Sequence, residues 1–314
     1  TSEGAFDISA ATYSGIALSI AAQDNDPRAM LFDDTGSVFY VMGSNGDDIN
    51  AYTLSTPNDP GTATFDSIAL SVAAQETDPS DKIFNNDGTT LYVMGATGDD
   101  INAYTLSTAY DISTATFSGI ALSVAAQETD PKALLFNDDG TILYVMGWNG
   151  DDINAYTMST PYDINTATFD SIALDISSEE TVPMDMHFSR NGTVLYVLGF
   201  NQRDINAYNL STPYDISTAT FDRIVLNVNA QETSVRGMVF NNTGSALYVT
   251  GVIGDDINEY SIPGVPYAAT TYSINVSNLS PATTYYVRSF GENEGGVSYS
   301  ITEPFTTLNA PPIV

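Results

Sequence analysis

The chain has 314 residues, and its 39 Asp and Glu against 8 Lys and Arg give a formal net charge of −31. Such a surface repels nucleic-acid phosphates and anionic lipid headgroups, so we expect neither nucleic-acid binding nor membrane insertion. A hydrophobic content of 43% is enough for a large folded core, and the absence of cysteine excludes disulfide and thiolate chemistry.

An internal repeat organises the first 264 residues. The stretch 143–159 recurs almost unchanged at 91–107, which is a step of 52 residues. Looser copies begin at Phe39, Leu195 and Leu247. The tyrosine that follows the first residue of each copy keeps the same step, as Tyr40, Tyr92, Tyr144, Tyr196 and Tyr248. A fixed period of this length indicates a solenoid, a propeller or an array.

Each copy contains four segments with the character of strands. In the third copy, in chain order, they are 115–126, 132–136, 141–146 and 153–158. The first and last alternate apolar with small or polar residues, and the two between are short and rich in apolar, β-branched and aromatic residues. Pro131 suits a strand entry because it cannot donate to a ladder, and Gly140 supplies the positive φ of a tight turn.

Four short strands per tandem unit predict an all-β, five-bladed β-propeller of 52-residue repeats. The chain begins with an outer strand, 11–22, and its last full copy ends at a third strand near Ile262. We therefore expect the N-terminal strand to complete the fifth blade, which would close the ring and remove an exposed edge. The alternative is a sixth blade formed by residues 271–308.

The segments 136–147 and 152–159 resemble the YVTN-type propeller repeat, which is also similar to repeats in surface and appendage proteins of marine bacteria and phages. The resemblance covers about residues 5–264. It implies a propeller fold and an extracellular or cell-surface location, and it says little about function.

The repeat breaks off after residue 264. Segments 271–290, 293–300 and 304–308 resemble the last strands of a fibronectin type III domain, in the version common in secreted Bacteroidetes proteins. The first strands of such a sandwich are missing. We therefore expect a β-propeller at residues 1–264 and a partial fibronectin type III-like segment at 265–314, which could pack on the propeller or mediate self-assembly.

Two acidic loops recur in every copy, and blade topology places both on one face of the ring. No cofactor is certain from the sequence, but such oxygen-rich loops suit hard cations, and calcium is the candidate. The candidate metal ligands are Asp47, Asp48, Asp99, Asp100, Asp151, Asp152, Asp255 and Asp256. The alternative is that these aspartates cap turns through side-chain to backbone hydrogen bonds.

Positions that differ between near-identical copies are the candidates for ligand binding. The residue after the repeated glycine is Trp148 in the third copy and Phe200 in the fourth, where an aromatic ring could stack on a sugar or pack between blades. The first position of the inner strand carries cations in three copies, Arg28, Lys132 and Arg236, which either bind a ligand or balance the nearby acids.

His187 is the only histidine, and the other copies have Leu or another aliphatic residue at its position. A structural role is therefore expected, and no serine lies in a nucleophile-elbow motif. We expect a non-catalytic extracellular binding or adhesion module, with a glycan or a surface protein as partner. The alternative is a structural subunit of an extracellular filament, sheath or phage appendage.

Overall fold

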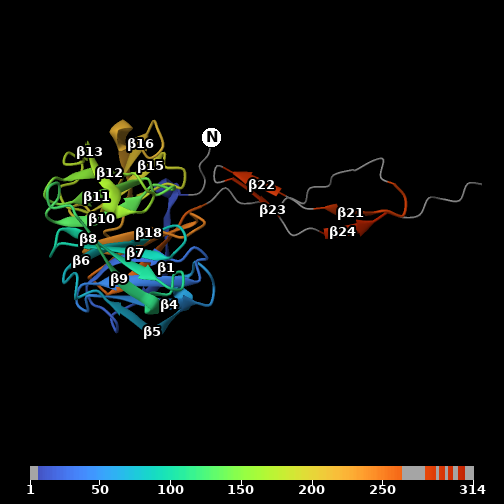
Figure 1. Cartoon of the computed structure of the whole chain (residues 1–314), viewed down its shortest axis with the longest axis horizontal. Coiled ribbons are helices and arrows are strands. Elements are labelled where there is room, and N and C mark those ends of the chain that lie inside the picture. The colour runs from blue at the N-terminus through green and yellow to red at the C-terminus, as the bar shows by residue number, and fades with distance from the viewer. Residues whose placement is uncertain (1–5, 264–279, 288–289, 294–295, 300–302, 308–314) are drawn as a thin grey trace, which may run out of the picture. The chain divides into compact units, whose positions relative to one another are not determined.

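The computed structural model describes residues 6–263, 280–287, 290–293, 296–299 and 303–307. The chain forms two compact units, Thr1–Val265 and Pro266–Val314. The first unit is built from five four-stranded antiparallel sheets, which follow one another in chain order from blue to orange in Figure 1. The all-β, five-bladed propeller predicted from the repeat is confirmed.

Each sheet is one blade, and its strands run in order from the inner to the outer edge. Blade 1 contains β2 (Pro27–Phe32), β3 (Val38–Gly43), β4 (Asp48–Leu54) and β5 (Ala63–Ser71). Blade 2 contains β6 (Pro79–Phe84), β7 (Thr90–Gly95), β8 (Asp100–Leu106) and β9 (Ala115–Ser123). Blade 3 contains β10 (Pro131–Phe136), β11 (Ile142–Gly147), β12 (Asp152–Met158) and β13 (Ala167–Asp175).

Blade 4 contains β14 (Pro183–Phe188), β15 (Val194–Gly199), β16 (Asp204–Leu210) and β17 (Ala219–Asn227). Blade 5 contains β18 (Val235–Phe240), β19 (Ala246–Gly251), β20 (Asp256–Ser261) and, from the other end of the unit, β1 (Thr12–Ser19). The inner strands β2, β6, β10, β14 and β18 contact one another in a closed circle.

The ring closes as the sequence predicts. β1 pairs antiparallel with β20, with Thr12 opposite Ser261 and Ser19 opposite Asp256. The segment before β1 also takes part, because the Phe6 amide donates to the Gly244 carbonyl at 2.9 Å. The Tyr196 hydroxyl of blade 4 donates to the Phe6 carbonyl at 2.8 Å. No strand of the second unit joins a propeller sheet in the described residues, so the sixth-blade alternative is wrong.

The outer strands are shorter than the sequence pattern suggests. The segment expected at 115–126 is a strand only to Ser123, because the Val124 amide turns to donate to the Asp99 carbonyl at 2.8 Å. The Gln127 and Glu128 amides then both donate to the Val124 carbonyl. Val124 is fully buried at this turn, so its apolar character reflects the core and not a longer strand.

The connections between the third and fourth strands each contain a short 3-10 helix that the apolar pattern did not reveal. In blade 3 it is η4 (Ile164–Thr166), where Asp163 caps the first turn by accepting from the Asn165 amide and Ile164 is buried. The equivalents are η1 (Ile8–Ala10), η2 (Pro60–Thr62), η3 (Ile112–Thr114) and η5 (Ile216–Thr218). Asp at the cap position satisfies an amide that no ladder could pair.

The hydrophobic core lies between neighbouring blades, and the repeated tyrosine links the two blades at each junction. Tyr144 packs with Phe188 of blade 4 at 5.0 Å between ring centroids, and its hydroxyl donates to the Tyr214 carbonyl of the same blade. Each repeated tyrosine makes the equivalent bond to the next blade, as Tyr40, Tyr92, Tyr196 and Tyr248 show. The period in the sequence is therefore a period of inter-blade contacts.

Antiparallel pairing gives the ring two chemically different faces. The loops before the inner strands and the turns between the second and third strands lie on one face, which we call the acidic face. The turns between the first and second strands and the 3-10 connections lie on the other, which we call the pocket face. The shared placement of the two acidic loops is confirmed by hydrogen bonds between them, such as Asn149 amide to Glu128 Oε1.

In the second unit, β21 (Thr284–Val287) pairs with β24 (Glu303–Thr306), and β22 (Phe290–Asn293) pairs with β23 (Gly296–Tyr299). Much of the segment 265–314 lies outside the described residues, so the expected fibronectin-like sandwich and the self-assembly through it stay predictions. Among the helices of the described chain, none has the length and apolar character needed to cross a membrane.

Candidate functional site

One carboxylate in each blade is buried beneath the loops of the acidic face. In blade 3 it is Glu128, which is 1% exposed and accepts from the Asp130 amide at 2.7 Å. It lies so close to Gly147 that an added Cβ there would come within 2.2 Å of the carboxyl carbon, which explains the repeated glycine. The equivalent residues are Asp24, Glu76, Glu180 and Glu232. These carboxylates serve first as acceptors for loop amides.

The Asp-Asp turns lie directly over these buried carboxylates. Asp151 has a left-handed φ of 47°, and its carbonyl accepts from the Ile176 amide at 2.9 Å. Asp152 Oδ1 accepts from the Asn154 side chain at 2.7 Å. Burial raises the pKa of Asp152, and the charge of Glu128 adds to the rise, while the bond from Asn154 opposes it. Neither of these contacts is the side-chain to backbone hydrogen bond of the turn-capping alternative, which stays a prediction.

The candidate calcium ligands do not converge into a metal centre. Within the part of the chain that the structure describes, no three acidic or histidine side chains form a group that could hold a metal ion. One oxygen is nevertheless buried without a hydrogen-bond partner in each of Asp47, Asp99, Asp151 and Asp255. Asp48, Asp100, Asp152 and Asp256 each bond to an asparagine two residues on. Calcium binding stays a prediction.

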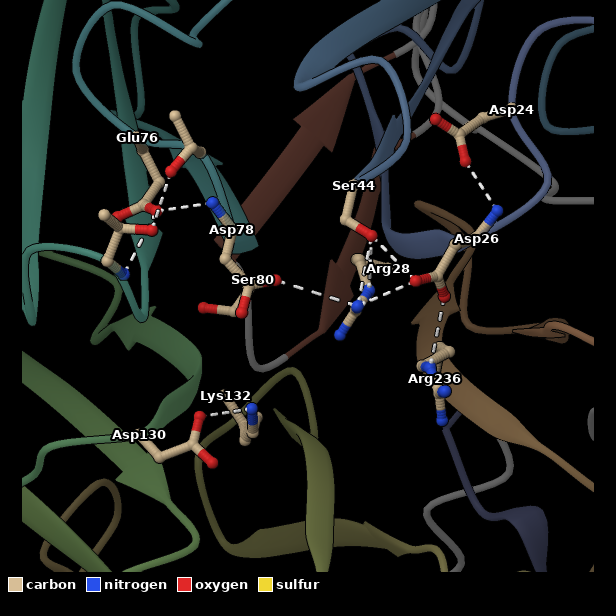
Figure 2. A network of polar contacts seen from close by, with 12 residues as sticks. Asp24, Asp26, Arg28, Ser44, Glu76, Asp78, Ser80, Asp130, Lys132 and Arg236 are labelled. Carbon is tan, nitrogen blue, oxygen red and sulfur yellow. Dashed lines mark hydrogen bonds and ion pairs between the residues drawn. The ribbon is translucent and has the colours of Figure 1, made fainter.

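Two of the three candidate cations meet over one aspartate (Figure 2). Asp26 accepts from Arg28 at 2.7 Å and lies 3.5 Å from Arg236 of blade 5. Arg28 also reaches Asp78 of blade 2 at 3.7 Å and donates to Ser44. Burial, together with the neighbouring Arg28, lowers the pKa of Arg236. This network joins blades 5, 1 and 2.

The aromatic candidates also contact neighbouring blades. The Trp148 indole donates to the Pro183 carbonyl of blade 4 at 2.8 Å, and the Lys132 ammonium lies 4.1 Å from the centre of its ring. Lys132 is held in turn by Asp130. Phe200 packs in the core between blades 4 and 5, with the guanidinium of Arg236 5.8 Å from its ring. Trp148 is still 38% exposed, so ligand binding there stays a prediction.

A buried ionic cluster at the centre of the ring was missed by sequence reasoning. Lys82 Nζ donates to the Ala29 carbonyl of blade 1 at 2.9 Å. Asp81 accepts from the Leu134 amide of blade 3, and Asp185 accepts from the Met238 amide of blade 5. Burial lowers the pKa of Lys82 and raises those of both aspartates.

The signal for this cluster is present in the repeat. Asp81 and Asp185 occupy the position of Ala29, Ala133 and Gly237, and Lys82 replaces a methionine or leucine. Inner strands have an unpaired edge, so a charged side chain there can satisfy a neighbouring blade's backbone. The cluster therefore joins blade 1 to 2, 2 to 3 and 4 to 5.

His187 has a structural environment. Its Nδ1 lies 2.7 Å from the Phe188 carbonyl, and its ring meets Phe240 of blade 5 edge-on at 5.0 Å. Burial lowers its pKa, which keeps the ring neutral. The neutral ring then donates its Nδ1 proton to the carbonyl.

Two cavities on the pocket face are lined by corresponding residues of successive repeats. We call them pocket 2–3 and pocket 3–4, after the blades that form them. Pocket 2–3 has a volume of ≈ 250 Å³ and pocket 3–4 of ≈ 500 Å³. The first is lined by Asn85, Thr90, Tyr92, Ala103, Thr105, Ser118, Pro161, Tyr162, Asp163 and Ile164. The second is lined by Asn137, Ile142, Tyr144, Ala155, Thr157, Asp170, Ile172, Pro213, Tyr214, Asp215 and Ile216.

Both pockets combine an apolar wall with hydroxyl, amide and carboxylate groups. In pocket 3–4, Thr157 on the third strand donates to Asp170 on the outer strand at 2.8 Å. Asp215 lines the pocket from the connection of blade 4, where it caps η5. Apolar surface with a few placed polar groups is the usual composition of a small-molecule site. Sequence reasoning missed these residues because nearly all of them repeat.

Comparison with known proteins adds no assignment. No protein-family model and no curated protein matches the sequence. Solved structures that it resembles include a functionally unknown Desulfotomaculum acetoxidans protein, with 15% identity, coverage of 76% of this chain and 69% of that one, and a TM-score of 0.47. A Bacteroides uniformis protein, provisionally assigned as a 6-phosphogluconolactonase, has 13% identity, coverage of 89% and 85%, and a TM-score of 0.48. None of these likenesses is evidence for an activity or a ligand.

Proposed function

We propose that this propeller is a non-catalytic binding module that holds saccharides in equivalent pockets between its blades. The observation that carries the proposal is the pair of cavities one repeat apart, lined by corresponding residues. A site that recurs at two successive blade junctions suits a ligand with identical units, because weak contacts then add through multivalency. Glycans on a cell surface or in an extracellular matrix are such ligands.

The chemistry of the lining supports a sugar over other small molecules. A pyranose offers hydroxyl groups for hydrogen bonds and an apolar C–H face for packing. Pocket 3–4 presents the Thr157 hydroxyl and carboxylates, together with Ile142, Ile172 and the Tyr214 side chain. An extracellular or surface location, with adhesion to a glycan or surface protein, belongs to the same proposal. The likeness of the repeat to the YVTN-type propellers is part of the same proposal, because it implies an extracellular or surface location.

Blocking substitutions taken from the protein's own repeat test the proposal. Glu259 stands in blade 5 where blades 2 and 3 have Ala103 and Ala155, so the fold accommodates a glutamate at this position. We expect Ala103→Glu and Ala155→Glu each to lower the number of sugars bound per chain, and the double variant to lower it most. The measurement is calorimetric titration with a glycan selected on an array.

Asp34→Ser is the matched control, because Asp34 is an exposed residue in a turn outside both pockets. It should bind like the wild type. Full binding by the double alanine-to-glutamate variant would show that the sugar site is elsewhere. If no glycan binds and particles appear by electron microscopy, the filament or appendage alternative is favoured instead.

A further inference from the structure

We propose that pocket 3–4 selects a saccharide that carries a primary ammonium group, whereas pocket 2–3 takes the neutral sugar. This inference rests on the proposed function and adds the ligand class. Its starting point is a difference between two otherwise matching cavities. Asp170 lines pocket 3–4, and Ser118 stands at the equivalent place in pocket 2–3.

The substitution gives pocket 3–4 two carboxylates, one from each of the blades that form it. Asp170 lies on the outer strand β13, and Asp215 on the connection of blade 4. Pocket 2–3 has a single carboxylate, Asp163, at the place equivalent to Asp215. Neither cavity has a lysine, arginine or histidine among its lining residues, so no basic side chain of the walls balances these charges.

The negative potential acts on the other groups of the pocket. Burial raises the pKa of Tyr144, and the charges of Asp215, of Asp139 outside the lining, and of Asp170 raise it further. An ammonium group placed between the two carboxylates would form charge-assisted hydrogen bonds, which are stronger than those between neutral groups. A bare metal ion would not fill a cavity of ≈ 500 Å³, and it would leave Ile142 and Ile172 without a partner.

The geometry of Asp170 is compatible with such a ligand. Its Oδ2 accepts from the Thr157 hydroxyl at 2.8 Å, which fixes the orientation of the carboxylate. Asp215 is fixed in a similar way, because its Oδ1 accepts from the amide and the hydroxyl of Ser217. Two carboxylates that are oriented before binding lose little side-chain entropy when a ligand arrives.

Two oligosaccharides that differ in the charge and in the acetyl group of the amino position provide the test. Glucosamine trimers carry ammonium groups, and N-acetylglucosamine trimers have the same backbone without them. We expect the wild type to prefer the glucosamine trimer at low ionic strength. Asp170→Ser should lower that preference, the ratio of the two affinities, by roughly tenfold, which is the scale of one charge-assisted hydrogen bond. Ser118→Asp should create a second amine-preferring site.

Both variants place in one pocket a residue that the other already carries, so each is expected to fold. Asp34→Ser removes one carboxylate outside the pockets and serves as the control for general attraction to an acidic protein. An equal loss of amine preference in Asp34→Ser and Asp170→Ser would overturn the inference, as would equal binding of both trimers by the wild type. If neither trimer nor any arrayed glycan binds, the proposed function itself fails.

Discussion

The acidic face and the pocket face use the same repeat in opposite ways. On the acidic face, residues that differ between copies join neighbouring blades, as Trp148 does with Pro183 and Arg236 with Asp26. On the pocket face, residues that repeat, such as Tyr144 and Thr157, line a cavity at each of two blade junctions. Divergent residues on the acidic face therefore add contacts specific to one blade junction, whereas repeated residues supply both the bond common to all junctions and most of the pocket lining.

The largest expected effect is a collective one on the acidic face. Burial raises the pKa of Asp48, Asp100, Asp152, Asp204 and Asp256 above the usual value of 3.8. Between the unfolded and the raised folded pKa values, the folded state binds more protons. Stability therefore falls as pH rises through this range and returns on acidification. We therefore expect the melting temperature to increase as the pH is lowered towards 3.8 at fixed ionic strength.

Asp152→Asn should reduce this pH dependence while keeping the bond to Asn154. A melting temperature that falls steadily on acidification would contradict the prediction. Sodium chloride should also raise the melting temperature by screening the acidic face. A further rise with calcium at the same ionic strength would support the predicted ion site, and no further rise would show that the acids are only solvated and capping turns.

Substitutions of two tyrosines in blade 3 allow the acidic face and the pocket face to be compared within one sheet. Tyr144→Phe leaves the Tyr214 carbonyl at the blade junction without its donor, which should cost about 1–3 kcal/mol of unfolding free energy. Tyr156→Phe, on the acidic side, removes a 3.1 Å bond to the half-buried Gln127 side chain, which can turn to water. Its cost should be about 0.5 kcal/mol. Urea unfolding midpoints, at an unchanged m value, measure both free-energy costs. Equal costs would show that the two faces do not differ in this respect.

The Trp148→Ala variant tests whether Trp148, on the acidic face, holds neighbouring blades together or binds a ligand. It removes the indole bond to Pro183 and the contact with Lys132, so we expect a loss of about 1–2 kcal/mol in stability. Blade 2 has Ala96 at this place, so the fold should persist. If a ligand binds at this loop, its affinity should fall by about 1–3 kcal/mol as well. Loss of affinity without loss of stability would assign Trp148 to binding instead of assembly.

The smallest effect is expected at His187. His187→Leu gives blade 4 the residue that blades 1 and 3 already have, as Leu31 and Leu135. The lost contact with the Phe188 carbonyl should be offset by better packing against Phe240, so stability should change by no more than about 0.5 kcal/mol. Thermal melts measure this change. A hydrolase activity that disappears in this variant would overturn the non-catalytic function.

The periodic parts of the molecule could be predicted from the sequence. The 52-residue step indicated the number of blades, and the strand order at the two ends indicated the β1–β20 closure. The turn glycines and the prolines at strand entries marked most boundaries correctly. These features are local, or they depend only on counting along the chain. The outer strands were predicted too long because Val124 is apolar for the core and not for the sheet.

The contacts between blades were decided by the tertiary structure. Asp81 and the Leu134 amide are 53 residues apart, and only closure of the ring brings them within hydrogen-bond distance. The pockets likewise depend on the gap between the sheet of one blade and the 3-10 connection of the next blade. No residue pattern in the sequence predicts that gap. The sequence determined what each blade is, and the packing of five blades around one axis determined where charges are buried and where a ligand could enter.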